Sequence, residues 1–406
     1  MTNKRKIIND PVYGFLSIDD ELIFDVISHP LFQRERNIKQ LGFTYLVYPG
    51  AVHSRFSHML GALNLMKRAI GVLRTKGVNI SDEESLAVQL AILLHDIGHG
   101  PFSHTSERAL AQVHHETLTQ LFMQRIDSDL DGRLKMAIEI FNDSYPRHFL
   151  HQLVSSQLDM DRLDYLARDS FFTGVSEGIV GTERIINMLN VKDDTLVVDE
   201  KGIYSIEKFI ISRRLMYWQV YLHKTVIAAD NLFYSILERA RQLLSEGVVL
   251  DGYAPLLLFL SDRYEEKDFK ANDLLLDNFA AIDDGDVMTT VKVWSHSSDK
   301  VLSTLCRNLL WRKLPHVAVS SEAYDDSALN EQITITAQSL QLDNNLAAYF
   351  VRTGRLVNRS YSFDDSEIKV LYKDGRCIGI SEASDQLDRH FLEKTVTKYF
   401  LSSPKK

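Results

Sequence analysis

The fold is decided by the stretch Leu90-Ala91-Ile92-Leu93-Leu94-His95-Asp96-Ile97-Gly98-His99-Gly100-Pro101-Phe102-Ser103-His104, in which an apolar run ends in a histidine and an aspartate. An imidazole and a carboxylate at the buried end of an apolar helix carry a large desolvation cost. A divalent cation is a partner that satisfies both groups. The stretch therefore predicts a metal site at a helix C-terminus and, with it, a metal-dependent hydrolase.

Helical spacing of apolar residues continues on both sides of this stretch. Ser81 and Glu84 form a capping box that opens the helix running to Asp96, and Gly98 and Gly100 explain its end. The same spacing predicts further helices at residues 31–39, 55–73, 116–125, 133–141, 159–167 and 206–245. The first part of the chain is therefore expected to be mainly α-helical.

Strand signals are fewer and lie late in the chain. We expect a small hairpin between residues 196–198 and 202–204, and a second one around Asp374-Gly375, a pair typical of a type I′ turn, between strands at 367–372 and 376–381. A last helix is expected at 383–399. The predicted organisation is a helical catalytic domain over residues 1–245 and an α+β region over 246–406, which would assemble subunits or complete the core.

Length and composition fit an ordinary globular protein. Of the 406 residues, 45% are hydrophobic and 25% charged, and no apolar run reaches the roughly 20 residues that cross a bilayer. The basic N-terminus lacks the apolar segment of a secretory signal, and Cys306 and Cys377 are too few for a disulfide framework. We therefore expect a cytoplasmic protein without membrane contact. The formal net charge of −9 argues against nucleic acid as a partner.

Two further segments are dense in polar side chains. The first runs from His53 to His58, and the second occupies residues 159–169. In the second segment acidic, basic and hydroxyl side chains recur at helical spacing and share one face of a helix: Asp161, Asp164, Tyr165, Arg168 and Asp169. Because His95 and Asp96 alone leave a cation incompletely bound, both segments supply candidate ligands.

Each of these segments also has a structural interpretation. The polar face of 159–169 could be an exposed helix with salt bridges along it. A single histidine such as His58, next to the apolar Met59 and Leu60, is often a hydrogen-bonded packing residue. From the residues alone, both interpretations stay open.

Taken together, the polar positions resemble the H…HD…D ligand signature of the HD-domain metallophosphohydrolases, with His58, His95-Asp96 and Asp161 in its places. The resemblance is closest to the branch of deoxynucleoside triphosphate (dNTP) triphosphohydrolases, which includes the vertebrate SAM-and-HD-domain enzyme and bacterial homologues. It covers residues 7–235 and is carried by the stretches 32–34, 38–42, 48–51, 53–58, 94–104, 115–116 and 161–169.

This resemblance implies a mainly α fold, an HD-domain helical bundle with small β-hairpins and a C-terminal α+β region. It also implies a reaction, the metal-dependent hydrolysis of a dNTP to a deoxynucleoside and inorganic triphosphate, in which water activated by the metal attacks the α-phosphorus. The implied metal ligands are His58, His95, Asp96 and Asp161. This mixed set suits Fe, Mn, Zn or Mg, and a second Mg could enter with the substrate.

Further site residues follow from the same resemblance. His115, oriented by Glu107, would protonate the leaving oxygen. The implied phosphate contacts are His99, His104, Arg55, Arg162, Tyr165 and Arg213, with Arg162 in place of the lysine of the vertebrate relative. The implied contacts around the sugar are Gln40, Leu41, Asp169 and Tyr221.

Regulation is also implied. In the vertebrate relative, a segment like residues 8–11 and residues like Gln33 and Arg36 line a regulatory nucleotide site between subunits. The resemblance therefore implies a homo-oligomer, a dimer or a tetramer, with a nucleotide at its interface. Ser28 stands where that relative uses an aspartate to read guanine, so guanine-specific activation does not follow.

Three other functions compete with this interpretation. A zinc peptidase is suggested by the two histidines of His95-Asp96-Ile97-Gly98-His99, but Gly98 and Gly100 break the helix that such a motif needs. A nucleotidase or cyclic-nucleotide phosphodiesterase would share the metal ligands without needing a triphosphate grip. A non-catalytic nucleotide-sensing protein would have no need of the intact ligand set.

Overall fold

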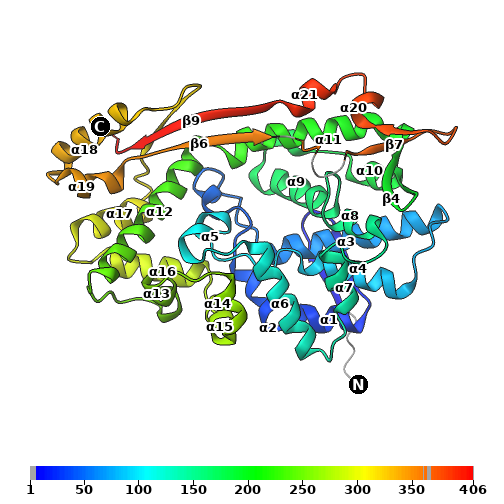
Figure 1. The fold of residues 1–406 in the computed structure, drawn as a ribbon, viewed down its shortest axis with the longest axis horizontal. Coiled ribbons are helices and arrows are strands. Elements are labelled where there is room, and N and C mark those ends of the chain that lie inside the picture. The colour runs from blue at the N-terminus through cyan, green and yellow to red at the C-terminus, as the bar shows by residue number, and fades with distance from the viewer. Residues whose placement is uncertain (1–5, 360, 364–366, 406) are drawn as a thin grey trace.

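A computed structural model describes residues 6–359, 361–363 and 367–405, with all side chains in these ranges except those of His104, Ser106 and Arg108. As predicted, the protein is mainly α, with three small sheets in the described ranges (Figure 1). The first half contains α1 (Glu21–Ser28), α2 (Pro30–Gln33), α3 (Arg55–Thr75), α4 (Asp82–Leu94), α5 (His104–Leu110), α6 (His115–Asp129), α7 (Lys135–Phe141), α8 (His148–Val154), α9 (Met160–Thr173), α10 (Thr182–Met188), α11 (Ile203–Met216) and α12 (Lys224–Ser245).

Helices α3, α4 and α9 form the centre of this half, with α3 packed against both of the others. The expected capping box is present, because the Ser81 hydroxyl accepts from the Glu84 N–H and the Glu84 carboxylate accepts from the Ser81 N–H. Helix α4 is buried around most of its circumference, so its apolar run needs no alternation with polar residues. Its last turn therefore delivers His95 into the interior.

Two expected helices are interrupted. The helix expected at 31–39 consists of α2 and a 3-10 turn, η1 (Arg34–Asn37), because Ile38 becomes extended to enter the core and Lys39 pairs with Ser54. The helix expected at 206–245 is two helices, since α11 ends in a π-helical turn at Tyr217–Tyr221. Helix α12 then starts afresh, with the His223 side chain accepting from the Thr225 N–H as its cap.

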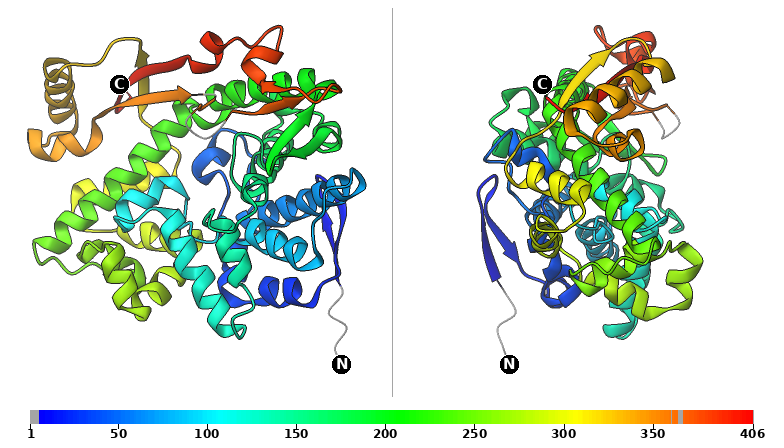
Figure 2. Two further views of the ribbon diagram at one scale, coloured as in Figure 1. Left: turned by 45° about the vertical axis from the view of Figure 1, so that its right-hand side comes forward. Right: turned by 90° about the vertical axis from the view of Figure 1, so that its left-hand side faces the viewer.

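The second half adds helices around α12 and two of the sheets. Its helices are α13 (Ala254–Ser261), α14 (Glu266–Ala271), α15 (Asp273–Ala280), α16 (Asp284–Trp294), α17 (Lys300–Leu310), α18 (Asp326–Leu340), α19 (Asn344–Ala347), α20 (Ile380–Ala383) and α21 (Arg389–Glu393). Helices α13 and α17 pack against α12, and residues from both halves contribute to one cluster of buried side chains. Figure 2 shows the two halves side by side.

The sheets join distant segments. They contain β1 (Lys6–Asp10) with β2 (Gly14–Ile18); β3 (Leu189–Lys192), β4 (Thr195–Asp199), β7 (Lys369–Leu371) and β8 (Cys377–Gly379) in that order; and β5 (His316–Ser320), β9 (Thr395–Ser403) and β6 (Arg352–Arg359) in that order. Strands β4 and β7 are parallel, and the other pairs are antiparallel.

Two expectations about strands are wrong in detail. The partner of β4 is β3 rather than residues 202–204, because Asp193 and Asp194 both adopt positive φ and make the tight turn before β4. The turn at Asp374-Gly375 joins β7 to β8 as expected, but only Gly375 of the pair has positive φ, so the turn is not type I′. The Asp374 carboxylate instead accepts from the Arg376 N–H at 3.0 Å.

The helix expected at 383–399 is also wrong. That segment begins at the last residue of α20 and contains the short α21 and then most of β9, whose two edges pair with β5 and β6. The run Thr395-Val396-Thr397 is β-branched and fits a pleated strand better than a helix. Among the described residues, no helix combines the length and apolar character of a membrane span.

Candidate metal centre and active site

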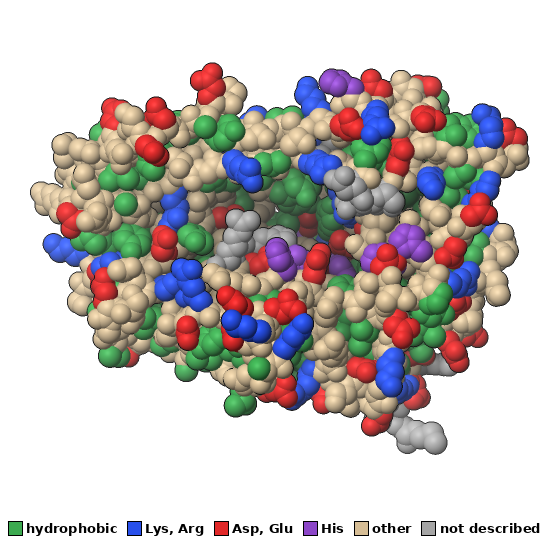
Figure 3. Space-filling view, in the orientation of Figure 1, with side chains coloured by type: hydrophobic (Ala, Val, Ile, Leu, Met, Phe, Trp, Pro, Cys, Tyr) green, Lys and Arg blue, Asp and Glu red, His purple; other side chains and the backbone are tan. Residues whose placement is uncertain are grey.

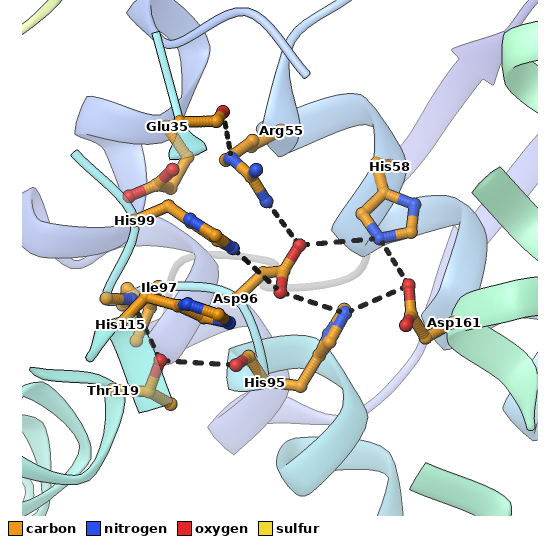
Figure 4. A network of polar contacts seen from close by, with 12 residues as sticks. Glu35, Arg55, His58, His95, Asp96, Ile97, His99, His115, Thr119 and Asp161 are labelled. Carbon is orange, nitrogen blue, oxygen red and sulfur yellow. Dashed lines mark hydrogen bonds and ion pairs between the residues drawn. The ribbon is translucent and has the colours of Figure 1, made fainter. Parts of the chain in front are cut away.

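Three helices bring the four predicted ligands together (Figure 4). His58 lies in the first turns of α3, His95 and Asp96 follow α4, and Asp161 lies at the start of α9. The Oδ1 atom of Asp161 is 3.1 Å from Nε2 of His58 and 3.4 Å from Nε2 of His95. The Asp96 carboxylate lies 3.7 Å from His58 Nε2 and 3.5 Å from His95 Nε2. His58, His95 and Asp161 form one compact group of possible ligand atoms, and Asp96 adjoins it and forms a second group with His99 and His115.

The two imidazoles are oriented for a cation. Nδ1 of His58 is 2.7 Å from Asp164, and Nδ1 of His95 is 2.7 Å from the Ile92 carbonyl oxygen. A carbonyl accepts only, so His95 carries a proton on Nδ1, and Nε2 is the nitrogen that faces the carboxylates. Both Nε2 atoms are buried without a hydrogen bond among the described residues. Two buried ring nitrogens that have no hydrogen bond and face carboxylates are the arrangement that a divalent metal ion would complete.

The charges around His58 and Asp161 also favour a cation at this position. Burial alone would lower the pKa of His58, but contacts with Asp161 and Asp164 raise it to about 10. Burial would raise the pKa of Asp161, but His95 and His58 hold it well below its usual value. The carboxylates therefore favour positive charge at this position, which is the condition that a cation satisfies.

A buried ion network supports α9 behind the metal centre. Arg168 donates to Asp164 through Nε at 2.9 Å and to Asp10 through Nη1 at 2.8 Å, and its side chain is fully buried. Helices α3 and α9 approach closely at Gly61, where an added Cβ would lie 2.0 Å from the Asp164 carboxylate. Only glycine leaves this room, so Gly61 allows α3 to carry His58 next to α9.

The predicted acid lies beside a second polar cluster. Nδ1 of His115 is 2.9 Å from Glu107, and its ring stacks on His99 with centroids 3.9 Å apart. Nε2 of His99 is in turn 3.6 Å from Asp96. The approach depends on Gly98, because a Cβ there would lie 2.2 Å from the His115 carbonyl oxygen. Gly98, the first glycine of the motif, thus allows the turn after α4 to pack closely against α6.

Arg55 joins the metal centre to the neighbouring loop. Its Nη1 forms an ion pair with Asp96, and its Nε donates to the Ser103 hydroxyl at 3.0 Å. Ser103 and Phe102 have φ of 52° and 54°, a left-handed conformation that costs free energy in residues other than glycine. The Phe102 N–H donates to Asp284 of α16 at 2.8 Å, so the second half of the chain holds this loop in place.

A cavity of about 400 Å³ lies next to Arg55. Of the predicted substrate residues, it is lined by Gln40, Leu41, Arg55, Tyr165, Asp169 and Tyr221. Asp169 is held there by the Tyr221 hydroxyl, which donates at 2.7 Å, and by His53 Nε2 at 2.8 Å. On the face drawn in Figure 3 the surface is hollowed near its centre, and histidine, acidic and basic side chains gather around the hollow.

Three predicted phosphate contacts, His99, Arg162 and Arg213, do not line this cavity. Arg162 Nε donates to the buried Asp159 at 3.0 Å. Arg213 is buried, and its Nε and Nη1 have no hydrogen bond among the described residues. The side chain of His104 lies outside the described part of the structure.

Several residues of the site have no signal that identified them from sequence. The sequence marks Asp164 only as one member of a polar helix face, although its spacing of three from Asp161 places both carboxylates against His58. Asp284 lies far along the chain, and nothing in its surroundings marks it as a contact of Phe102. Asp230 lines the cavity from α12 and has no recognisable motif.

Comparison with known proteins identifies the family. The sequence profile of the HD domain matches residues 55–169, and the profile of the HD associated region matches residues 180–248. An uncharacterized protein of Bacillus subtilis, YwfO, is 36% identical over 320 residues, which cover 77% of this chain and 71% of that protein. The chain belongs to the HD-domain phosphohydrolases, in the family that includes the dNTP triphosphohydrolases.

Named relatives and solved structures agree with this assignment. The deoxynucleoside triphosphate triphosphohydrolase SAMHD1 homolog of Dictyostelium discoideum is 31% identical over 259 residues, 59% of this chain and 50% of that protein. The bovine SAMHD1 is 29% identical over 274 residues, 56% of this chain and 46% of that protein, so the match spans about half of these relatives. The crystal structure of a phosphohydrolase from Bacteroides thetaiotaomicron superposes with a TM-score of 0.96 at 49% identity, covering 99% of this chain and 100% of that one.

Proposed function

We propose that the protein hydrolyses dNTPs to a deoxynucleoside and inorganic triphosphate. The observation that carries this proposal is the position of Arg55, which contacts Asp96 in the metal centre and also lines the adjacent cavity. A ligand in the cavity would therefore have its phosphates at Arg55, next to the metal ligands. The relatives named as dNTP triphosphohydrolases support the choice of substrate.

The cavity wall suits a deoxyribose. Asp169 is oriented by His53 and Tyr221 and retains lone pairs that can accept from a 3′-hydroxyl. Gln40 Oε1 is buried without a hydrogen bond among the described residues, so it offers a second acceptor. Leu41 adds an apolar wall that would leave a ribose 2′-hydroxyl unsatisfied, and this favours the deoxy sugar.

The phosphates would meet cations and hydroxyl donors. Arg55, Arg162 and Arg213 supply guanidinium groups, and the unpaired N–H groups of buried Arg213 favour an anionic ligand. Burial raises the pKa of Tyr165 to about 12, so its hydroxyl stays protonated and can donate to a phosphate oxygen. His99, and in the proposal His104, would face the same phosphates.

The bound cation would lower the pKa of a water molecule and polarise an α-phosphate oxygen. We propose that His58, His95, Asp96 and Asp161 hold it, as Fe, Mn, Zn or Mg, and that a second Mg accompanies the triphosphate. Water attacks the α-phosphorus, and the bond from phosphorus to the 5′-oxygen breaks. His115 donates a proton to that oxygen, and Glu107 stabilises the protonated imidazole before transfer.

We further propose a homo-oligomer, a dimer or a tetramer, with a regulatory nucleotide at its interface. The β1–β2 hairpin exposes 70% of Ile7 and 75% of Phe15, which suits contact with another subunit. Nearby on the surface, Arg36 Nε donates to Gln33 at 2.7 Å, so both side chains are ordered where a nucleotide could bind. Sedimentation velocity with and without added dNTPs tests this proposal, which predicts a nucleotide-dependent shift in mass.

The activity itself is tested by product analysis. Metal-loaded protein is incubated with dNTPs, ribonucleotides, dNMPs and cyclic nucleotides, and the products are followed by phosphorus NMR. The proposal predicts inorganic triphosphate from dNTPs, loss of turnover in Asp161→Ala, and normal turnover in Glu331→Ala, an exposed acid on α18. Release of pyrophosphate or orthophosphate, or turnover of only dNMPs or cyclic nucleotides, would contradict it.

A further inference from the structure

Asp230 is a carboxyl group that the proposed reaction does not use. It lies on α12 one helical turn after Val226, and both residues line the cavity that contains Arg55 and Asp169. Its side chain is half-buried, so it faces the open space of the cavity rather than the packed core. The Thr105 hydroxyl donates to Asp230 Oδ1 at 3.1 Å and fixes the orientation of the carboxyl group.

Among the described residues, Asp230 has no salt bridge. Arg55, the arginine that lines the same cavity, is paired with Asp96 instead. Burial raises the pKa of Asp230 to about 7, opposed only by the hydrogen bond from Thr105. A carboxyl group in this environment lacks the neighbouring cation that an acid in a purely structural role usually has.

Charge determines which part of the ligand can lie beside Asp230. A triphosphate carries several negative charges, and like charges in a partly buried site repel strongly. The phosphates therefore belong at Arg55, and the neutral end of the nucleotide belongs at Asp230. The same cavity is also lined by the apolar side chains of Phe102, Leu222 and Val226, which suit the face of a nucleobase.

We infer that Asp230 accepts a hydrogen bond from an amino group on the pairing edge of the base, so that the enzyme favours dGTP, dATP and dCTP over dTTP and dUTP. The inference rests on the proposed function and adds the class of base to it. Guanine, adenine and cytosine carry an amino donor on this edge, whereas thymine and uracil have one N–H between two carbonyl groups. Guanine is expected to bind best, because it offers two neighbouring donors to one carboxylate.

A competition assay tests the inference directly. Equimolar dGTP, dATP, dCTP and dTTP are mixed with metal-loaded protein, and the loss of each is followed by chromatography, which gives ratios of kcat/KM. We expect dTTP to be consumed at least about tenfold more slowly than dGTP, the difference that one unpaired polar contact produces. Consumption of dTTP at the same rate as the other three would overturn the inference.

The variant Asp230→Asn distinguishes base recognition from a purely structural role of Asp230. An amide can donate to O4 of thymine and accept from N3–H, whereas guanine offers it two neighbouring donors and no matching acceptor, so the ratio of dTTP to dGTP turnover should rise at least about tenfold. The matched control is Asn231→Ala, because Asn231 lines a different pocket. An unchanged ratio in an active Asp230→Asn variant would overturn the inference.

Failure of the proposed function is recognisable separately. If no dNTP releases triphosphate, the proposed reaction is wrong, whatever Asp230 binds. Calorimetric affinities of the wild-type protein for the same four dNTPs then test the inference, which predicts at least about tenfold weaker binding of dTTP. Equal affinities would overturn it. The wild-type measurements also decide the matter if Asp230→Asn does not fold.

Discussion

The Oδ2 atom of Asp164 lies 2.7 Å from Nδ1 of His58, and the same carboxylate also accepts from Arg168. This contact fixes the ring so that Nε2 faces Asp161 and Asp96. Asp164 thus determines which nitrogen of His58 faces the other candidate ligands. Outer contacts of this kind raise the basicity of the ligand and hold its direction.

Asp164→Asn should therefore weaken metal binding while keeping the four ligands. We expect about a 10- to 100-fold loss of affinity, the usual effect of removing such a contact. The measurement is a competitive metal titration against a chelator of known affinity, with folding checked by circular dichroism. Asp161→Asn serves as comparison and should lose more, because it removes a direct ligand. An affinity equal to that of the wild type would contradict the role of Asp164.

His115→Ala should separate proton donation from metal binding. Because His115 contacts Glu107 and His99 rather than the His58, His95 and Asp161 group, metal content should stay at the wild-type level. Loss of a positioned acid should lower kcat about 10²- to 10⁴-fold. The neighbouring His114 is 91% exposed and provides the control, since His114→Ala should leave kcat unchanged. Undiminished turnover in His115→Ala would remove it from the acid role.

Asp284→Ala should loosen the loop that carries Ser103. The Asp284 carboxylate accepts from the backbone N–H groups of Phe102 at 2.8 Å and Lys39 at 3.0 Å, and both would lose a buried partner. We expect a loss of about 2–6 kcal/mol in the free energy of unfolding, from about 1–3 kcal/mol for each of the two unsatisfied groups. Urea denaturation measures it, with exposed Asp277→Ala as the control. A free energy within error of the wild type would show that the loop does not depend on this contact.

The buried carboxyl group of Glu35 should make the stability of the protein depend on pH. Burial raises the pKa of Glu35 from 4.5 to about 7, although Arg34 and Arg55 oppose the shift. Below pH 4.5 both folded and unfolded states hold the proton. As the pH rises toward 7 the unfolded state releases it first, so stability is lost, up to about 3 kcal/mol at 1.4 kcal/mol per pKa unit.

Glu35→Gln removes this titration. The stability of the variant relative to the wild type, measured as the free energy of unfolding, should therefore be greater at pH 8 than at pH 4.5. Urea denaturation at several pH values gives the difference. Glu21→Gln, an exposed acid at the start of α1, is the matched control and should show no such trend. A difference between Glu35→Gln and the wild type that does not change with pH would show that Glu35 ionises normally in the folded state.

The candidate metal centre could be predicted from the sequence because the patterns that indicate it are local. The capping box at Ser81, the apolar run and the His95-Asp96 pair all lie in one short segment, and the α9 stripe repeats at helical spacing. Such patterns report which residues share a helix face. They do not show which helices pack against each other, so the contact of Asp164 on α9 with His58 on α3 could not be predicted from the sequence.

The rest of the site depends on distant segments. Asp284 and Asp230 reach the cavity region because α16 and α12 pack beside the HD-domain helices, and no periodic pattern encodes that packing. The error at 383–399 has a related cause. Apolar spacing in that segment fits a helix, but pairing with β5 and β6 on both edges favours the strand β9.

The parallel pairing of β4 with β7 has a consequence for biosynthesis. Val198 pairs with Val370, so one edge of β4 has no backbone partner until the ribosome has made most of the chain. An uncovered strand edge is a template for association with other chains. Nascent or stalled polypeptides should therefore be prone to aggregate at β4, and chaperones that shield extended segments should improve the yield of active protein.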